Sequence, residues 1–249
     1  MKVSNNDLLL LLLFLIIIKF YYKKNLIKNK FEKFNNKPII WMYWENLPGK
    51  KKPGYIDLCI DSIKHNCSNC FNIVICNENT ITNYIPDINN IDLSGLKIPI
   101  KADYYRYCLL HKYGGIWLDA DTIVLKCLCP IYKKLEEYDY IGFGCGYKIK
   151  DCGMMKIGYG KPFNGIMMSK PNTKFITCVK NKAIYNIKND KMNYYHSIGR
   201  YILEKCIKEC KINNPSWDYY HFPSECQEYD SFGNKLYNIL SENINVLDC

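Results

Sequence analysis

Hydrophobic and polar positions alternate in blocks along residues 38–249, and the blocks predict an α/β domain. Short runs rich in β-branched and aromatic residues are separated by stretches with apolar residues at helical spacing. Strands are expected at residues 39–44, 71–76, 116–118, 122–125, 138–143 and 163–168. Helices are expected at residues 55–65, 101–113, 171–186 and 199–210. Strands that alternate with helices in this way are typical of an open sheet covered by helices.

The stretch from Lys101 to Lys126 joins a helix, a turn, a strand and an acidic loop without a gap. Apolar positions at helical spacing over residues 101–113 predict an amphipathic helix with one buried stripe. Two glycines end this helix. The apolar run 116–118 then leads directly into Asp119-Ala120-Asp121, so two carboxylates are expected at the end of a buried strand.

This position of the carboxylates has a chemical consequence. In an open α/β sheet, ligands bind in the crevice beyond the carboxyl ends of the strands. Asp119 and Asp121 would repel a bound diphosphate unless a cation lay between them, and carboxylate oxygens suit Mg²⁺ or Mn²⁺. Asp103 and Arg106 lie one turn apart on the preceding helix and are expected to reach the same crevice. A lone Asp-x-Asp is more often a pair of solvated turn acids, but the whole stretch predicts a metal–nucleotide site.

The same stretch resembles the sugar-binding, DxD-containing region of retaining glycosyltransferases with the GT-A fold. The similarity is to capsular polysaccharide synthesis proteins and to the related initiating α-mannosyltransferases of yeast and glucosyltransferases of clostridial toxins. It is carried by motifs in the family's order and spacing, namely Lys101-Ala102-Asp103 with Arg106, Tyr113-Gly114-Gly115 and Asp119-x-Asp121.

Two further segments extend the resemblance to roughly residues 37–240. Pro38-Ile39-Ile40-Trp41 is similar to the family's opening strand, and Tyr220-His221-Phe222 with Glu225 is similar to a late motif of the capsular branch. The resemblance implies a Rossmann-like, nucleotide-sugar-binding mixed sheet flanked by helices over residues 38–249.

The resemblance also implies a metal site. Mn²⁺ or Mg²⁺ would be bound by Asp119 and Asp121, with His221 as the candidate third ligand and Glu225 as the second candidate. A histidine between two aromatic residues is more often a packing residue, so both readings of His221 stay open.

Candidate catalytic residues by the same resemblance are Asp103, Arg106, Asp119 and Asp121. Donor binding is expected from Asp103, Arg106, Asp119 and Asn164. A tryptophan from the opening strand stacks on the nucleotide base in the toxin branch, which makes Trp41 the candidate here and Tyr43 the next. The alternative is that an aromatic-rich strand is simply core.

The expected reaction is the transfer of a hexosyl residue from a UDP- or GDP-sugar to a glycan, glycolipid or protein acceptor. The resemblance implies retention, by front-side attack in which the departing phosphate oxygen takes the acceptor proton. A catalytically silent carbohydrate-binding protein on the same fold is the alternative, although it need not keep the acids and Arg106 together. A Cys-rich structural protein and a phosphotransferase are less favoured, because cysteine pairing patterns and a Gly-rich phosphate loop with Lys are absent.

The N-terminal residues 1–30 are expected to form a membrane anchor with a basic flank, followed by a short stem at residues 31–37. Residues 8–18 are an unbroken apolar run, and no small-x-small site indicates a cleaved signal peptide. The basic flank favours a cytoplasmic domain, whereas a Golgi-type enzyme would face the lumen, so the orientation stays open. The net charge of +10 indicates a membrane surface or an anionic substrate rather than nucleic acid, because no basic helix with base-reading residues occurs.

The fourteen cysteines have irregular spacing. Cys67-x-x-Cys70 is half of a zinc site, but no second Cys-x-x-Cys or His pair completes it. Most cysteines, such as Cys59, Cys76 and Cys108, are expected to be small buried hydrophobes, with a minority able to form disulfides.

Three local features complete the expectations. Asn66-Cys67-Ser68 is a glycosylation sequon. Asn79 is expected to cap a helix. Seven glycines within residues 142–165 predict a mobile loop over the crevice.

Overall fold

The computed structural model describes most of the chain from residue 37 onward. The described residues are 19, 37–144, 162–191, 197–214, 216, 220–223, 228–229, 235–236 and 246–248. The chain divides into two units, residues 1–37 and 38–249, and the second contains the domain described below. The predicted anchor and stem lie outside the described residues, apart from Lys19 and Lys37. Within the described part, no helix has both the length and the apolar composition needed to cross a bilayer.

A six-stranded mixed sheet forms the centre of the domain, in the order β2-β1-β3-β6-β5-β7. Its strands are β1 (Ile39–Tyr43), β2 (Asn72–Cys76), β3 (Gly115–Leu118), β5 (Tyr140–Gly144), β6 (Pro162–Ser169) and β7 (Tyr220–Pro223). Strand β1 runs parallel to β2 and β3, whereas β6 runs antiparallel to β3 and β5. Strand β7 is parallel to β5. The predicted mixed α/β sheet is confirmed.

Two short strand pairs accompany this sheet. Strand β4 (Thr122–Val124) pairs antiparallel with β10 (Val246–Asp248), so the C-terminal strand lies beside the strand that follows the acidic loop. Strand β8 (Glu228–Tyr229) pairs with β9 (Lys235–Leu236).

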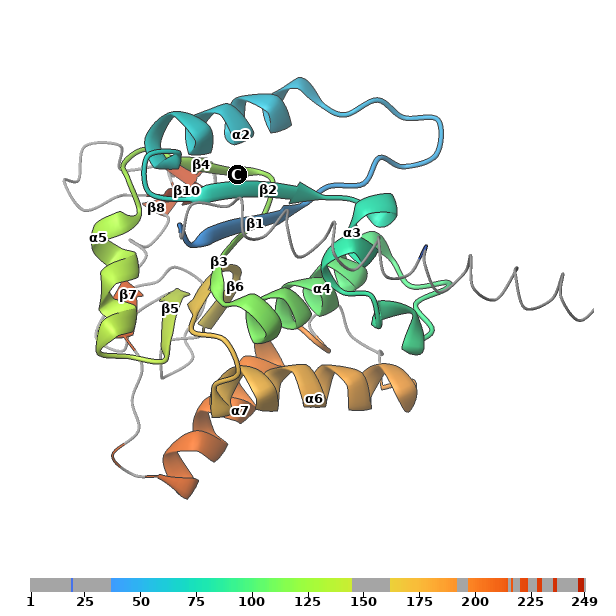
Figure 1. The fold of residues 1–249 in the computed structure, drawn as a ribbon, viewed down its shortest axis with the longest axis vertical. Coiled ribbons are helices and arrows are strands. Elements are labelled where there is room, and N and C mark those ends of the chain that lie inside the picture. Colours follow the sequence, from blue (N-terminus) through green and yellow to red (C-terminus); the bar gives the residue numbers. More distant parts are fainter. Residues whose placement is uncertain are drawn as a thin grey trace, which may run out of the picture. The chain divides into compact units, whose positions relative to one another are not determined.

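Helices cover both faces of the sheet. They are α2 (Gly54–Cys67), α3 (Glu78–Tyr84), α4 (Ile98–Tyr113), α5 (Cys129–Tyr132), α6 (Lys174–Lys188) and α7 (Arg200–Asn213), with 3-10 turns η1 (Ile88–Asn90) and η2 (Lys133–Glu136). Helix α2 lies on one face, and α4, α6 and α7 lie on the other (Figure 1). A disulfide between Cys178 and Cys206 joins α6 to α7.

Strand β1 shows how the two faces are filled. Ile40 and Met42 belong to the core cluster that includes the inner residues of α2. Trp41 and Tyr43 point the other way, and the Tyr43 ring lies 4.9 Å from that of Tyr105 on α4. These four side chains are at most 5% exposed, as expected for a parallel strand covered on both faces.

Helix α4 differs from the predicted amphipathic helix. It begins at Ile98, with a proline in its first turn, and every residue from Asp103 to Leu110 is buried. The helix packs against α6 as well as against β1, β3 and β6. The prediction of a single buried stripe is therefore wrong, because α4 lies between the sheet and a second layer of helix.

Two local predictions are also corrected. The cap of α3 is Asn77 rather than Asn79, since the Asn77 side chain accepts hydrogen bonds from the backbone N–H groups of Asn79 and Thr80. The glycine-rich segment is not irregular at its ends, because Gly142 and Gly144 lie in β5 and Gly165 lies in β6. Residues 145–161 lie outside the described residues, so the predicted mobile loop is not tested there.

The order of the strands reverses at β1. The chain moves from β1 to β2 through α2 on one side, and then returns through α3 and α4 to place β3 on the other side of β1. Since the parallel strands β1 and β3 end at the same edge, their carboxyl ends form a topological switch point, where open α/β sheets bind ligands.

The approach of β3 to β1 depends on Gly115. Its φ is +97°, and a Cβ atom on it would lie 2.3 Å from the backbone oxygen of Ile39. No side chain fits there without moving one of the two strands.

Gly115→Ala is therefore expected to lower the free energy of unfolding by at least about 2 kcal/mol, from backbone strain and displacement of β1. Gly54→Ala is the matched control, because a Cβ at the start of α2 meets nothing within 4 Å. Its effect is expected within about 0.5 kcal/mol. Denaturant unfolding of both variants measures the difference, and equal stabilities would contradict this account of the β1–β3 contact.

Candidate active site

The acidic loop begins where β3 ends. The backbone N–H of Asp119 donates to Gly165 of β6 at 2.9 Å, and the N–H of Thr122 donates back to the Asp119 carbonyl at 3.1 Å. Asp119-Ala120-Asp121 is therefore a closed turn at the switch point, beside β6. This confirms the predicted position of the two acids at the end of a buried strand.

A buried arginine on α4 connects this loop to the interior. Arg106 Nη2 lies 3.0 Å from Asp103 Oδ1 and 2.9 Å from Asp119 Oδ1. Arg106 Nη1 donates to the backbone oxygen of Asn164 on β6. The Asn164 side chain in turn donates to Asp103 Oδ1 at 2.8 Å. Four residues predicted for the site thus form one hydrogen-bonded network across α4, β3 and β6.

Trp117 completes this network and was missed in the sequence. Its indole N–H donates to Asp119 Oδ1 at 2.7 Å, and the Arg106 guanidinium lies over its ring at 5.0 Å. A signal was available, because residues two apart on a strand point to the same side. Trp117 therefore orients both the arginine and the carboxylate.

The network has a buried part and an accessible part. Asp103 is 8% exposed and Arg106 is 3% exposed, whereas the Asp119 side chain is 32% exposed and Asp121 is half-buried. The terminal nitrogens of Arg106 point to protein acceptors, so in this structure the arginine positions Asp119. Direct contact of Asp103 or Arg106 with a donor sugar stays a prediction.

The charges at the site do not balance. Three carboxylates, those of Asp103, Asp119 and Asp121, surround one guanidinium. Burial, and next the charge of Asp119, raise the pKa of Asp121. Burial is also the main reason that the pKa of Asp103 rises to about 6, against the opposing effect of Arg106. A cation beside Asp119 and Asp121 would relieve this excess of negative charge.

The donor set fits a hard divalent cation only in part. The accessible carboxylates of Asp119 and Asp121 offer oxygen ligands of the kind that Mn²⁺ and Mg²⁺ prefer, with water and phosphate completing the shell. Among the described residues, no three carboxylate or histidine groups converge as a ready-made cage here. Magnesium sites that use one or two protein carboxylates, with water and substrate phosphates as the other ligands, are usual in nucleotide-binding proteins.

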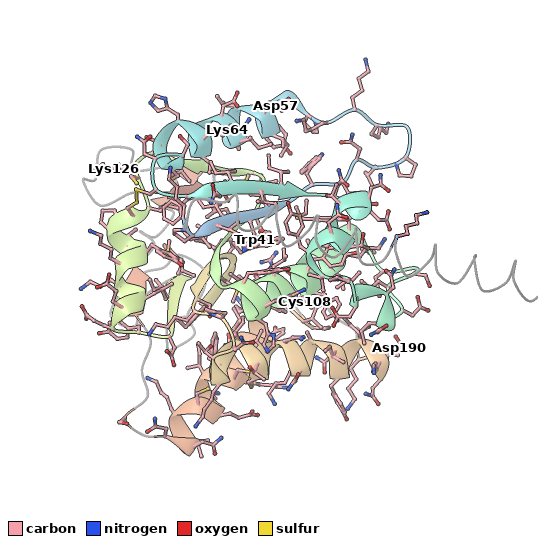
Figure 2. The ribbon with its side chains drawn as sticks, viewed as in Figure 1. Trp41, Asp57, Lys64, Cys108, Lys126 and Asp190 are labelled. Carbon is pink, nitrogen blue, oxygen red and sulfur yellow. A yellow bond between two sulfur atoms is a disulfide. The ribbon has the colours of Figure 1, made fainter. Side chains whose placement is uncertain are left out.

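The two aromatic donor-binding candidates lie in the core. Trp41 is 0% exposed, and its indole N–H donates to the carbonyl of Gly114 at 3.0 Å. Figure 2 shows Trp41 between the sheet and α4. Tyr43 is 5% exposed and donates to Glu45 at 2.5 Å. The burial of Trp41 favours the core alternative, because β1 is covered on both faces, and base stacking by Trp41 is not tested.

A better-placed aromatic residue directly follows β1. Trp44 is only partly buried, packs against the core cluster, and donates its indole N–H to Asn46 at 2.8 Å. It lies at the carboxyl end of β1, the edge where the acidic loop also begins. The sequence pointed to Trp44 as well, because it is the last aromatic residue of the run at residues 41–44.

The candidate third metal ligand lies on a distant strand. His221 is in β7, where its backbone pairs with Gly142 of β5. Strands β6 and β5 separate β7 from β3, and three strand spacings amount to about 14 Å. Ligation by His221 stays a prediction, and Glu225 lies outside the described residues.

The fold and the site together define a class of protein. A sheet whose strand order reverses beside an acidic loop has the ligand-binding crevice of open α/β domains. The chain belongs to the capsular polysaccharide synthesis protein family, whose model matches residues 13–242.

One curated protein and two solved structures illustrate what the chain is similar to. An uncharacterized glycosyltransferase of Acanthamoeba polyphaga mimivirus is 31% identical over 121 residues, which are 47% of this chain and 42% of that protein. The chain thus matches less than half the length of that relative. The PaToxG glycosyltransferase superposes with a TM-score of 0.44 at 16% identity, over 79% of this chain and 77% of that chain. The apo form of GlyE of Streptococcus pneumoniae has a TM-score of 0.44 at 14% identity, over 75% and 45%.

The raised pKa of Asp103 predicts a pH dependence of stability. The folded chain holds the Asp103 proton up to about pH 6, whereas the unfolded chain releases it near pH 4. The stabilisation by that proton is therefore present below about pH 4 and is lost as the pH rises through about 6. From about pH 4 to about pH 7, wild type should lose up to about 3 kcal/mol of unfolding free energy relative to Asp103→Asn.

Denaturant unfolding at several pH values measures this difference in stability. Asp61→Asn, at an exposed position of α2, is the matched control. Parallel curves for wild type and Asp103→Asn would show that Asp103 is ionised throughout.

Proposed function

We propose that this protein is a glycosyltransferase that moves a hexosyl residue from a UDP- or GDP-sugar to a glycan, glycolipid or protein acceptor. Membership of the capsular polysaccharide synthesis protein family and the partial similarity to a viral glycosyltransferase support the reaction class. The observation that carries the proposal is the pair Asp119 and Asp121 at the switch point of the sheet, with Asp119 held by the buried Arg106.

The two accessible acids have distinct roles in the proposed reaction. Asp121, whose pKa is raised by burial and by Asp119, has the most to gain from a bound cation and would be the principal ligand of Mn²⁺ or Mg²⁺. Asp119 would contribute its second oxygen, since Oδ1 already accepts from Arg106 and Trp117. The bound ion would neutralise charge on the departing nucleoside diphosphate as a Lewis acid.

The buried residues keep these acids in place. Arg106 and Trp117 hold one oxygen of Asp119 from two directions, so the carboxylate cannot rotate freely. Asp103 and Asn164 hold Arg106 in turn. A site organised in this way meets its substrate with little reorganisation, which is the main requirement for stabilising charge in a transition state.

The proposed stereochemical course is retention by front-side attack. In this course the acceptor hydroxyl gives its proton to the departing phosphate oxygen, so no side-chain nucleophile is required. The burial of Asp103, with its Oδ1 directed at Arg106 and Asn164, agrees with a positioning role rather than a nucleophilic one.

The proposal includes a membrane location through residues 1–30, with the side of the membrane open. An anchor would bring the domain to lipid-linked or membrane-associated acceptors. The sequon at Asn66 does not argue for either side, because its amide is engaged in the fold. Asn66 Nδ2 donates to the carbonyl of Val124 at 2.8 Å and to that of Ser62 at 3.0 Å.

Asp121→Asn is expected to reduce metal-dependent donor hydrolysis and transfer by at least about a hundredfold, because it removes the charge that the cation neutralises. The melting temperature should stay the same or rise slightly, since the carboxylate is partly buried beside another anion. The full chain, incubated with a panel of UDP- and GDP-sugars and Mn²⁺, provides the measurement.

Asp61→Asn on the outer face of α2 serves as the matched Asp-to-Asn control and should keep full activity. Near-normal turnover of Asp121→Asn with Mn²⁺ would overturn the metal assignment. Donor binding by wild type without any turnover would instead indicate a silent carbohydrate-binding protein.

A further inference from the structure

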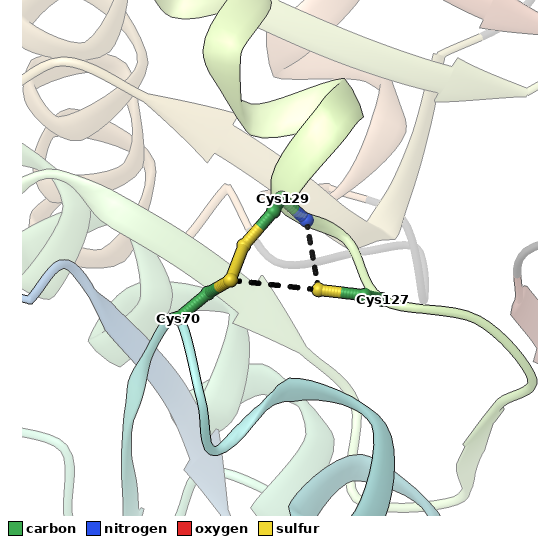
Figure 3. Close-up of side chains that lie close together, drawn as sticks. All are labelled: Cys70, Cys127 and Cys129. Carbon is green, nitrogen blue, oxygen red and sulfur yellow. Dashed lines mark hydrogen bonds between the residues drawn. A yellow bond between two sulfur atoms is a disulfide. The ribbon is translucent and has the colours of Figure 1, made fainter.

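Four cysteines from two separate segments of the chain come together at one end of the domain. Cys67 is the last residue of α2, and Cys70 lies in the turn before β2. Cys127 lies between β4 and α5, and Cys129 is the first residue of α5, almost sixty residues later. Figure 3 shows Cys70, Cys127 and Cys129 facing one another. Cys127-x-Cys129 therefore lies beside Cys67-x-x-Cys70, which had no such partner pair in the sequence.

The sulfur positions are those of a compact cluster. The Sγ atoms of Cys70, Cys127 and Cys129 all lie within 4.8 Å of one another. Cys70 Sγ and Cys127 Sγ are 3.7 Å apart. The fourth thiol, that of Cys67, is in hydrogen-bond contact with Cys127. Tetrahedral zinc with Zn–S bonds of about 2.3 Å separates its sulfurs by about 3.8 Å. The distance between Cys70 and Cys127 is close to this value, whereas Cys129 Sγ is bonded to Cys70 Sγ and Cys67 lies outside the group of three.

Backbone N–H groups are directed at two of the sulfurs. The N–H of Cys129 donates to Cys127 Sγ at 3.4 Å, and the N–H of Leu128 donates to the sulfur of Cys67. Donors of this kind stabilise the thiolate form and orient it toward a metal.

A disulfide accounts for only half of the cluster. The structure joins Cys70 to Cys129. Cys67 and Cys127 remain as thiols, of which Cys127 lies against this bond and Cys67 is in contact with Cys127. The buried thiols Cys59, Cys76 and Cys108 meet the expectation of small core hydrophobes, whereas this group of four brings two pairs from distant segments together.

We propose that the reduced cluster of Cys67, Cys70, Cys127 and Cys129 binds one Zn²⁺ ion through four thiolates. A dithiol or phosphine reductant supplies the two electrons that open the Cys70–Cys129 bond, and two protons from water complete the thiols. Binding of Zn²⁺ then releases the four thiol protons to solvent. Soft thiolates select zinc over Mn²⁺ and Mg²⁺, so this site is chemically distinct from the carboxylates of the acidic loop.

The site would have a structural role. It ties the end of α2 to the chain just beyond β4, which is the strand that follows Asp121. Helix α2 already holds β4, because Ser62 Oγ accepts from the N–H of Val124 at 3.0 Å and Asn66 donates to its carbonyl. Zinc would close this connection at its C-terminal side.

The test uses the full chain, purified in mild detergent with a non-chelating phosphine reductant and supplied with Zn²⁺. After gel filtration, elemental analysis is expected to find about one zinc per chain, and Cys127→Ser should retain at least about tenfold less. Cys210→Ser is the matched control, since Cys210 is a partly exposed free cysteine on α7 outside the cluster, and it should keep its zinc. Asp121→Asn should keep it as well, which separates this site from the acidic loop.

Cobalt gives a second measurement that does not depend on the variant folding. Co²⁺ added to the reduced wild-type chain should produce the charge-transfer and visible bands of tetrahedral thiolate coordination, and Zn²⁺ should abolish them. Zinc-free protein without cobalt bands, or equal zinc in wild type and Cys127→Ser, would overturn the proposal and leave the Cys70–Cys129 disulfide as the function of the cluster.

Discussion

The geometry of the site depends on one buried cation, the guanidinium of Arg106. Removing a guanidinium and two carboxylates from water costs several kcal/mol per ion, and this cost is offset only if the hydrogen bonds are well placed. Here Arg106 meets Asp103, Asp119 and the Asn164 carbonyl, while Trp117 covers its face. The ion therefore joins a helix, a parallel strand and an antiparallel strand at the edge where the sheet binds ligands. It is a structural residue of the core as well as a residue of the site.

Much of the fold could be predicted from the sequence, because its strands are short apolar runs and its helices carry apolar residues every three to four positions. The burial of α4 could not. Asp103 and Arg106 have the polarity of surface residues, and only the tertiary structure shows that they neutralise one another inside. The same limit applies to Trp41, since an aromatic residue in a strand fits a base-stacking role and a core role equally well until the covering helix is known.

Long-range pairings were also beyond the sequence. The approach of Cys127 and Cys129 to Cys67 and Cys70 results from the connection of β4 to α5, and no periodicity in the chain encodes it. Contacts between residues close in sequence were easier to predict. Trp117 is two residues from Asp119 on one strand, and Asn77 immediately precedes α3, where its side chain can accept from the first free N–H groups.

The burial of the middle of α4 on all its faces affects how this family can diverge. On a surface helix, charged residues such as Asp103 and Arg106 could be replaced at little cost. Here they are buried and paired, so a related protein that lost one of them would be expected to lose stability as well as activity. The two accessible acids of the turn, Asp119 and Asp121, are less constrained by the stability of the fold. Related proteins that have lost sugar transfer should therefore still keep the buried network. Differences at Asp119 and Asp121 would distinguish active from inactive members of the family.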